Sequence, residues 1–584
     1  MRAHSAHISL RVFYSFGLTV ALLAGVLSTA GPATASGVSA ITSSVVGSDG
    51  RTYTVTNHLR TDVLAERPRL RREWLLVWAG DAQAESGQPD PDFLAVVDAT
   101  RGSRDYGKVV NTLTIDSVFG NEPHHMQYVW HKGHRIYAGG LLSDTTYVFD
   151  ATHLPLLTLA GITLPADTPC GSVPDAYRVL DDGTAYASYM GGPDVPGPCR
   201  YTNGETRDGN GYAGSPGEVV RIGPNGQRIA EIPTATRHGE DATLCPNVPE
   251  LAQPSCANPH GLAVREDLDL MVTSDFVEVR NIIPTPPENP YLARDTIRVF
   301  DIANRNNPRL LSVSRLPDGP RQEPDPRWEE PRAAMEVTVT HQRRHRGAFA
   351  TTMAGGAVFY TPDISAPNPQ WREVFDDATA FKHLFPTDTP TSDSDGGSWV
   401  HVSPDDRFLF HVVLQGGPRS PGEWHTGMVY VLDIRPTLAA GNRVRCSIDT
   451  MAEVTGGGRE RDCPRLIDAV PIRDVTFGGP HWAAMDNFAR GHDGFYREST
   501  EISRVATANY FVAAVGADGD HRVCMTSVSP HGRLSPDNAF RDELTGTPCV
   551  DFDRDQWPHG TTGPARPHGL LFAIADADVR GRFH

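Results

Sequence analysis

The sequence carries none of the short motifs by which several large enzyme classes are detected. Neither a Gly-x-Ser-x-Gly nucleophile elbow nor a complete Walker phosphate-binding loop occurs among its 584 residues, so the usual serine-hydrolase and P-loop signatures are missing. Amphipathic helical patterns are almost absent. No Cys-x-x-Cys pair occurs either, and a thiolate zinc site of the common kind is therefore not indicated.

Positive charge is also scarce. The chain has 53 Lys and Arg residues against 71 Asp and Glu residues, which gives a formal net charge of −18 at pH 7. Nucleic-acid binding requires a cationic surface that neutralises phosphates. We therefore expect no nucleic-acid partner. The composition gives no indication of the oligomeric state.

Long apolar runs are missing except near the N-terminus, where arginines precede an apolar stretch from Phe13 to Leu27 and small residues follow it. This pattern is typical of a secretory signal peptide. We assign the signal peptide to residues 1–35, with cleavage at Ala33-Thr34-Ala35 or, alternatively, at Val38-Ser39-Ala40. An uncleaved anchor helix is the other interpretation, although the run is short for a membrane span. We expect a secreted, extracellular protein without stable membrane insertion.

The eight cysteines form close sequential pairs, and the intervals between the partners are rich in Gly, Pro or charged residues. An even number of cysteines in an exported chain favours disulfides that staple loops. Metal thiolates are the alternative. The predicted pairs are Cys170 with Cys199, Cys245 with Cys256, Cys446 with Cys463, and Cys524 with Cys549.

Short strand patterns recur at intervals of tens of residues, and Gly (55) and Pro (47) are abundant without a period. In each copy a strand that opens on a His or an acidic residue is followed by a charged turn and by further strands ending in Asp. Such repeats predict an all-β protein, a β-propeller, with about seven blades. Six or eight blades, or a set of unrelated sandwich domains, are the alternatives. The clearest copies begin at Glu122, Pro259 and Val400.

The two ends of the chain predict how the ring closes. The unit that begins at Trp74 lacks an opening His strand, whereas Pro567-His568-Gly569 opens a strand with no blade behind it. We expect the C-terminal strand to complete the N-terminal blade, which removes the open edges. Residues 36–73 are then an N-terminal extension, and residues 74–584 form the propeller domain with long rim loops.

Histidines open several of the expected inner strands. In a propeller the inner strand of each blade lines the central channel, so these side chains converge on one axis. Neutral imidazoles from several blades suit copper, iron or zinc. The alternative for each His is a structural bond to the next blade's backbone or to channel water. The candidate ligands are His125, His260, His401, His481 and His568.

Two further residues join this candidate site. His124 precedes His125 and, by strand alternation, should face the other way, so it is a candidate ligand or an orienting group. Glu336 occupies a similar inner position in another blade. It is a candidate catalytic base or an orienting group for a ligand; a buried carboxylate paired with an Arg is the alternative.

Several motifs, in chain order over roughly residues 74–575, resemble those of the selenium-binding protein and methanethiol oxidase family. The segment from Pro91 to Asp98 followed by His124-His125 is similar to that family's opening. The segments Met335–His341, Ser403–Phe410 and Gly478-Gly479-Pro480 are similar to later family motifs, and His568 stands where the family has a late His.

This resemblance implies a seven-bladed propeller and a copper-dependent oxidase that converts methanethiol to formaldehyde, hydrogen sulfide and hydrogen peroxide. By position, it implies that His124, His125 and His568 are metal ligands, and it matches Glu336 and His341 to a family Glu and His. The chain departs from the family after the His-His pair, where its Cys-rich segment is absent, and at Pro174–Arg178, which replaces an internal His-x-x-His-Cys.

Two hypotheses follow for the function. The first is a secreted metal-dependent oxidoreductase that resembles the methanethiol oxidases and acts on a small molecule in the axial channel, with copper as the expected metal and iron or zinc as alternatives. The second is a non-catalytic secreted propeller that binds a ligand or a protein at its rim, with structural histidines.

Overall fold

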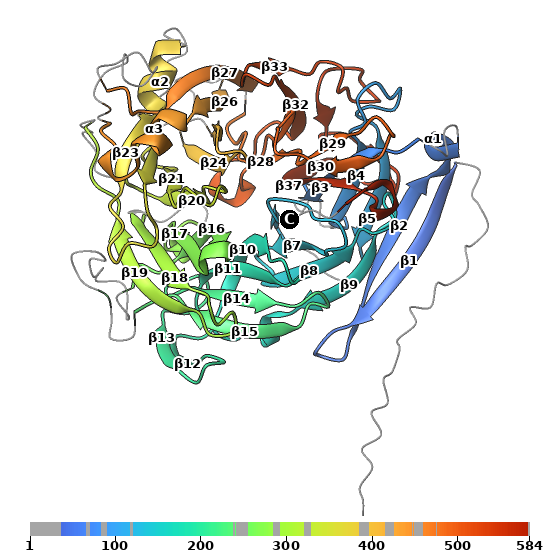
Figure 1. The fold of residues 1–584 in the computed structure, drawn as a ribbon. Coiled ribbons are helices and arrows are strands. Elements are labelled where there is room, and N and C mark those ends of the chain that lie inside the picture. Colours follow the sequence, from blue (N-terminus) through green and yellow to red (C-terminus); the bar gives the residue numbers. More distant parts are fainter. Residues whose placement is uncertain are drawn as a thin grey trace, which may run out of the picture.

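Seven antiparallel sheets are arranged around one axis as the blades of a β-propeller (Figure 1). The structure, a computed structural model, describes residues 37–581 apart from residues 66–69, 83–89, 117–120, 237–239, 241–254, 284–292, 321–328, 385–395, 415–424, 447, 449–459 and 475. The prediction of an all-β propeller with seven blades is confirmed. The predicted signal peptide, residues 1–35, lies outside the described residues.

The innermost strands of the seven blades form a closed ring around the axis. Each one contacts the inner strands of the two neighbouring blades. In chain order of the blades they are β6 (Pro123–Met126), β10 (Ser172–Val179), β16 (Pro259–Arg265), β20 (Ala334–Val339), β24 (Gly397–Val402), β28 (Trp482–Met485) and β37 (Ala565–Ile574). We number the blades 1 to 7 in this order.

Each inner strand begins a sheet of at least four strands. Going outward, blade 1 continues with β7 (Ile136–Gly140), β8 (Thr145–Asp150) and β9 (Thr158–Thr163), and blade 2 with β11 (Ala185–Gly191), β14 (Glu218–Ile222) and β15 (Arg228–Pro233). Blade 3 continues with β17 (Leu270–Asp275), β18 (Thr296–Asp301) and β19 (Arg309–Arg315), and blade 4 with β21 (Ala348–Thr352), β22 (Ala357–Thr361) and β23 (Arg372–Asp376). Blade 5 continues with β25 (Phe408–Val413), β26 (His425–Asp433) and β27 (Arg465–Asp474), and blade 6 with β31 (Arg504–Ala508), β32 (Arg522–Val528) and β33 (Leu534–Pro536), where β34 (Val550–Asp551) also pairs with β32.

The C-terminal strand closes the ring, as predicted. β37 pairs antiparallel with β3 (Glu73–Asp81), in a register that runs from Glu73 opposite Ile574 to Asp81 opposite Ala565. Blade 7 then continues with β4 (Phe93–Asp98) and β5 (Val109–Ile115). Because both ends of the chain contribute to one sheet, the propeller has no open blade at the junction.

The described part of the N-terminal extension adds to the same blade. β1 (Val38–Val46) and β2 (Thr52–Arg60) form a hairpin, and β2 pairs with β5, so blade 7 has six strands. The short helix α1 (Thr61–Ala65) follows. β1 also contacts β9 of blade 1. The extension therefore covers the edge at which the ring is closed.

The blades are apolar on both faces because each packs between two others. Every residue of β4 is buried, and so are the residues of β3 except those at its two ends. Helices α2 (Asp377–Leu384) and α3 (Arg435–Ala440) lie at the periphery, beside blades 4 and 5 (Figure 1). No helix of the described residues is both long and apolar enough to span a bilayer.

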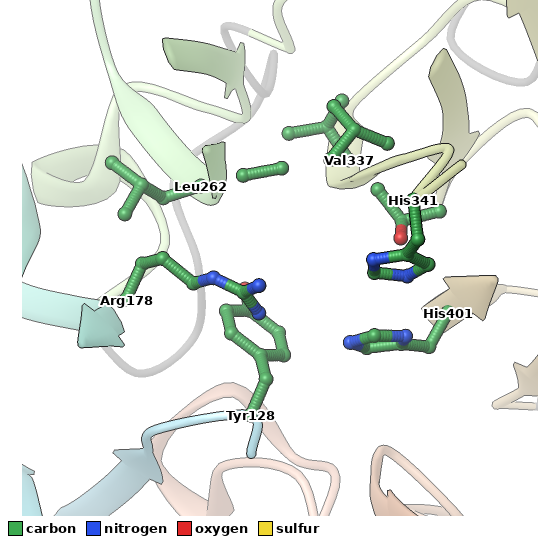
Figure 2. A pocket seen from close by; sticks show the side chains of 9 residues that line it. Tyr128, Arg178, Leu262, Val337, His341 and His401 are labelled. Atoms are coloured by element: carbon green, nitrogen blue, oxygen red, sulfur yellow. The ribbon is translucent and has the colours of Figure 1, made fainter. Parts of the chain in front are cut away.

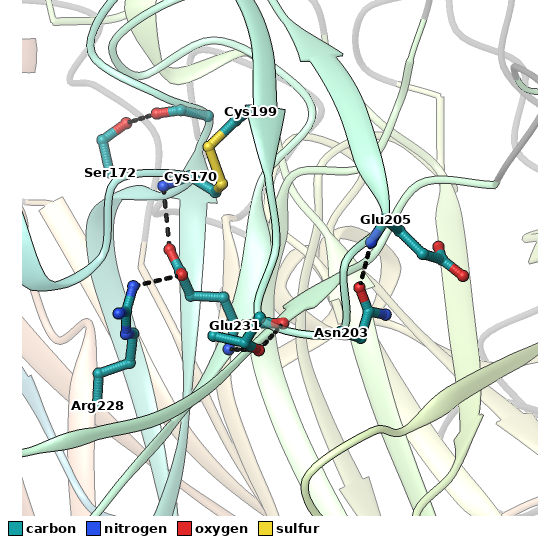
Figure 3. Close-up of a disulfide and its surroundings, with 9 residues drawn as sticks. Cys170, Ser172, Cys199, Asn203, Glu205, Arg228 and Glu231 are labelled. Carbon is teal, nitrogen blue, oxygen red and sulfur yellow. Dashed lines mark hydrogen bonds and ion pairs between the residues drawn. A yellow bond between two sulfur atoms is a disulfide. The ribbon is translucent and has the colours of Figure 1, made fainter.

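Three of the four predicted disulfides are present. They join Cys170 to Cys199, Cys446 to Cys463, and Cys524 to Cys549. The first ties the start of blade 2 to the ribbon of β12 (Gly197–Arg200) and β13 (Thr206–Gly209), as Figure 3 shows in close-up. In the fourth predicted pair, Cys245 lies outside the described residues, so that pair stays a prediction.

Candidate metal centre

The inner strands break their regular pairing where they begin. Five of them show a register shift within their first residues, and β37 shows one opposite Trp78 and Ala79. In such a β-bulge an extra residue is inserted and side chains are re-aimed. The bulges lie between Pro123 and Met126, Pro174 and Tyr177, Pro259 and Leu262, Ala334 and Val337, and Gly397 and Val400.

Hydroxyl groups hold three of these bulges in place. Ser188 Oγ accepts the Ala176 N–H at 3.0 Å and donates to the His260 carbonyl of the next blade at 2.6 Å. Ser274 and Thr351 make the same two kinds of bond in blades 3 and 4. A bulge removes an N–H from the ladder, and a buried N–H needs a partner. The hydroxyls therefore satisfy the bulges and tie each blade to the next.

The repeated Pro-His-Gly motif has a steric cause. A Cβ on Gly261 would lie 2.7 Å from Glu336 Cα, and a Cβ on Gly569 would lie 2.7 Å from the carbonyl oxygen of His124. Both contacts are with the inner strand of the next blade. Glycine lets neighbouring backbones approach closely at the axis, which brings the preceding histidines, His260 and His568, into the channel.

Four of the predicted ligands meet at the axis. One ring nitrogen from each of His124, His125, His481 and His568 can be chosen so that all four lie within 4.8 Å of one another. The Nε2 atoms of His125 and His481 are 3.0 Å apart. Two imidazoles on one ion lie about 2.9–3.4 Å apart, given bonds of ~2.0–2.1 Å and angles between 90° and tetrahedral. The 3.0 Å separation between His125 Nε2 and His481 Nε2 therefore suits two adjacent ligands of one metal ion.

Two carboxylates extend this cluster. Asp175 Oδ1 lies 3.1 Å from both His124 Nε2 and His125 Nδ1, and Asp175 Oδ2 lies 3.2 Å from His260 Nδ1. Glu336 Oε1 lies 3.3 Å from the same His260 nitrogen. His124, His125, Asp175 and His260 form a second group able to hold an ion. Two carboxylates therefore lie in direct contact with the imidazoles of the channel.

Burial sets the protonation of these groups. It lowers the pKa of His124, His125, His481 and His568 well below the ordinary value, and neighbouring imidazoles act in the same direction. Neutral imidazole is the form that binds metals. For His260 burial acts in the same way, but Asp175 and Glu336 outweigh it and raise the pKa.

Many polar atoms of the cluster have no hydrogen-bond partner among the described residues. Both nitrogens of His568 and Nδ1 of His124 have neither a hydrogen bond nor an ion-pair contact there. The Nδ1 atoms of His125 and His260, both oxygens of Asp175 and Oε1 of Glu336 have only the ion-pair contacts of 3.1–3.3 Å given above. Buried polar groups are normally paired, because an unpaired one costs about 1–3 kcal/mol. The atoms without any contact belong to the neutral imidazoles of His124 and His568, whose lone pairs a bound cation would satisfy. The residues therefore fit a metal ion.

Apolar side chains enclose the cluster. The ring of Phe511 lies 4.4 Å from that of His481, Phe276 lies 5.0 Å from His260, and Trp482 stacks on His125 at 4.0 Å between centroids. Phe276 and Phe511 belong to an apolar cluster at the end of the channel where the inner strands begin. This surrounding excludes water, so electrostatic interactions at the site are strong.

His401 lies apart from the four-His group. It follows the bulge of β24, and its ring stacks on His341 with centroids 5.8 Å apart. Both rings line a small cavity with Tyr128 and Arg178 (Figure 2). In β24 the residue near the other axial groups is Ser398, which contacts His481 Nδ1 at 2.7 Å. His401 therefore belongs to a different layer of the channel from the ligands it was predicted to join.

His124 does not face away from His125, contrary to the expectation from strand alternation. The two rings stack with centroids 4.2 Å apart, and His124 also lies 3.9 Å from the ring of His568. The cause is the bulge between Pro123 and Met126, within which alternation is lost. Both histidines of the pair therefore point into the channel.

Asp175 is the main site residue that the sequence analysis missed. A signal was present, because Pro174-Asp175 occupies in blade 2 the place that Pro-His occupies in other blades. Tyr128 is a second site residue that the sequence analysis missed. Its hydroxyl donates to Glu336 Oε2 at 2.6 Å. It follows β6 and carries no motif of its own.

The fold and this cluster together define a seven-bladed propeller with a buried histidine–carboxylate centre. No protein-family model matches the chain, and no curated protein matches it. Among solved structures it is similar to a hypothetical selenium-binding protein from Sulfolobus tokodaii, with a TM-score of 0.53 and 14% identity over 88% of this chain and 96% of that one. This similarity supports a distant relationship in fold to the propeller that the sequence motifs resemble.

Two other solved structures match with lower scores. They are a periplasmic gluconolactonase from Pseudomonas aeruginosa (TM-score 0.44, 13% identity, 86% of this chain and 99% of that one) and a functionally unknown protein from Desulfotomaculum acetoxidans (TM-score 0.42, 9% identity, 86% and 98%).

Proposed function

We propose that this protein is an exported, metal-dependent oxidoreductase that acts on a small molecule at the propeller axis. The observation that carries the proposal is the convergence of four buried imidazoles whose ligand nitrogens lie within 4.8 Å of one another. Their low pKa values keep them neutral, and a bound cation would satisfy the two nitrogens of His568, which have no hydrogen-bond partner among the described residues.

His124, His125, His481 and His568 would hold the metal, with Asp175 beside them. Imidazole and carboxylate ligands suit copper, iron and zinc; we propose copper, following the resemblance to methanethiol oxidases, with iron or zinc as alternatives. When bound, copper or iron would supply one-electron chemistry with dioxygen. Methanethiol is the substrate that the resemblance suggests.

Glu336 is the proposed catalytic base. Burial raises its pKa, and Tyr128 donates a hydrogen bond to Oε2. Its Oε1 atom faces His260 Nδ1, whose pKa is also raised. The pair can hold one proton between these two atoms, next to the position of the metal. Glu336 could therefore accept a proton from a bound substrate and pass it to His260.

Export is part of the proposal. The signal-peptide pattern predicts it, and the three disulfides are typical of proteins from oxidising compartments. A disulfide-bonded chain is best produced by secretion, so the exported protein is the form to assay.

Metal analysis of the purified protein tests the metal centre. We expect close to one copper ion per chain, with the content of His481→Gln and His568→Gln reduced strongly and that of His492→Ala unchanged, since His492 is exposed. Circular dichroism of each variant shows whether it is folded. A metal-free wild-type protein that also fails to take up copper, iron or zinc would contradict the proposal and would favour the non-catalytic, rim-binding propeller.

Oxygen uptake tests the reaction. Methanethiol added to the copper-loaded protein should cause oxygen consumption, and Glu336→Gln should lower the rate while the metal content is retained. A metal-loaded protein that consumes no oxygen with methanethiol or other small thiols would contradict the thiol oxidase assignment.

A further inference from the structure

The inner strand of blade 2 enters the channel through a strained residue. Val173 has a φ of 63° and lies directly before Pro174, where the bulge of this strand starts. A positive φ is unfavourable for an L-residue, because Cβ approaches the backbone, and for a β-branched residue it is a genuine outlier. Gly396 has the same place in blade 5 with a φ of 60°, and a glycine adopts this conformation freely. Blade 2 therefore carries a valine where the backbone favours glycine.

Neighbouring groups hold Val173 in this conformation. Its N–H donates at 2.6 Å to Oδ1 of Asp144, a buried residue in the turn between β7 and β8 of blade 1. The residue before it, Ser172, donates to the Gly192 carbonyl at 2.6 Å and accepts the Ala213 N–H at 2.9 Å. The Val173 side chain is fully buried in the apolar cluster at the end of the channel. A strained residue persists only where its surroundings determine its conformation, and such residues gather at functional sites.

The conformation of Val173 decides where Asp175 points. Asp175 follows two residues later, and the ring of Pro174 between them fixes its own φ. An ordinary negative φ at Val173 would therefore redirect the segment that carries the Asp175 carboxylate. In the observed conformation this carboxylate lies 3.1 Å from nitrogens of His124 and His125 and 3.2 Å from His260 Nδ1.

We infer that Val173 and Asp144 are positioning residues of the candidate metal centre: the left-handed backbone of Val173, held by the Asp144 carboxylate, aims Asp175 at the imidazoles. Neither residue is proposed as a ligand, and the inference rests on the proposed metal centre. Groups that orient the ligands of a metal affect its affinity strongly, and a site binds best when such groups are already in place. The strained conformation presets the Asp175 carboxylate before an ion binds.

Removal of the Asp144 carboxylate tests the inference. Asp144 itself has a φ of 50°, so Asp144→Gly keeps the turn and deletes the acceptor of the Val173 N–H. We expect copper affinity, measured on the exported protein by competition with a chelator, to fall about 10- to 100-fold. Asp144→Asn keeps the acceptor oxygen and should bind copper like the wild type. Asp144→Ser, whose oxygen is one bond closer to the backbone, should show the same loss as Asp144→Gly, so the test does not depend on one variant folding.

A second substitution separates positioning from a general loss of stability. A glycine at position 173 adopts a positive φ about as readily as a negative one, so adding Val173→Gly to Asp144→Gly should restore copper affinity to within about threefold of the wild type. Asp269→Gly is the control, because Asp269 is exposed, has a φ of 52° and lies in the turn between β16 and β17. It relieves the same kind of strain and should not restore the affinity of Asp144→Gly. A Val173→Gly double variant as weak as Asp144→Gly would overturn the inference, as would restoration by Asp269→Gly.

Crystals of the metal-free exported protein separate this inference from the proposed function. In Asp144→Gly we expect a negative φ at Val173 and an Asp175 carboxylate withdrawn from the imidazoles, and in the Val173→Gly double variant we expect the carboxylate to return. An Asp175 carboxylate that stays in place in Asp144→Gly would overturn the inference even if copper binds to the wild type. If the carboxylate moves as expected but no variant and no wild-type protein binds a metal, the proposed function fails while Val173 and Asp144 still position Asp175.

Discussion

Ser398 fixes the orientation of His481. His481 donates from Nδ1 to Ser398 Oγ at 2.7 Å, and the Ser398 hydroxyl donates to the His481 carbonyl at 2.7 Å. The ring therefore carries its proton on Nδ1, and its Nε2 lone pair points at the channel, 3.0 Å from His125 Nε2. Metal-binding histidines are typically held in this way through their second nitrogen.

Ser398→Ala should therefore weaken metal binding without removing a ligand. We expect a loss of affinity of about 10- to 100-fold, the usual effect of deleting a group that orients a ligand, measured by competition with a chelator. Ser403→Ala is the control, because Ser403 is also buried but its hydroxyl bonds Asp405 and the Phe408 N–H in the turn between β24 and β25. Equal affinities for both serine variants would argue against an orienting role.

Asp175→Asn should also reduce metal affinity, by at least about tenfold, because it removes a buried negative charge that faces three imidazoles. It should in addition lower the pKa of His260, which Asp175 raises. Metal competition and NMR titration of the apo protein measure the two effects. Unchanged copper affinity in a folded Asp175→Asn protein would place the ion away from this carboxylate.

Gly261→Ala should destabilise the propeller at the axis. The new Cβ would lie 2.7 Å from Glu336 Cα, from Val337 N and from Ser274 Oγ, and overpacking of a tight interior costs about 1–3 kcal/mol. The free energy of unfolding measures this cost. Gly546→Ala is the comparison for steric crowding, because its Cβ would meet nothing within 4 Å, although its positive φ of 70° adds backbone strain. A cost for Gly261→Ala that does not exceed that of the comparison variant would contradict the steric explanation of the Pro-His-Gly motif.

His559 should make stability depend on pH. Its ring is bonded to Thr112 and Thr562, and burial, with help from His58 and Arg554, lowers its pKa to about 3. The unfolded chain takes up a proton near pH 6.5 and the folded one does not, so this residue lowers the free energy of unfolding as the pH falls below about 6.5.

The variant His559→Gln should reduce the slope of unfolding free energy against pH by on the order of 1.4 kcal/mol per pH unit between about pH 6 and 4. Urea denaturation at several pH values measures the slope, and His492→Gln, at an exposed position, is the control. An unchanged slope in His559→Gln would show that this imidazole is protonated in the folded protein.

The sequence predicted the fold better than the site. The strand repeats indicated the blades, and the unmatched strands at Trp74 and His568 indicated the closure that β3 and β37 make. His125 and His568 were recognised because the Pro-His pattern precedes a clear apolar strand. These features are local, and a single sequence displays them directly.

The parts that were missed depend on where a strand starts and on its bulge. A strand that opens at Val400 predicts His401 at the axis, whereas β24 begins at Gly397 and brings Ser398 to the axis. Alternation in a regular strand predicts that His124 faces away from His125. The bulge between Pro123 and Met126 breaks this alternation. Asp175 stands in the segment Pro174–Arg178, which departs from the family motif, so a search for histidines passes over it although its position matches theirs.

The central claim is that the axial imidazoles share one metal ion, and anomalous diffraction from crystals of the exported protein tests it most directly. Data collected on both sides of the copper, iron and zinc absorption edges identify the metal and its position together. We predict one strong peak at the axis, within about 2.3 Å of ring nitrogens from at least three of His124, His125, His481 and His568. A map without a peak among these rings, in protein supplied with all three metals, would contradict the account.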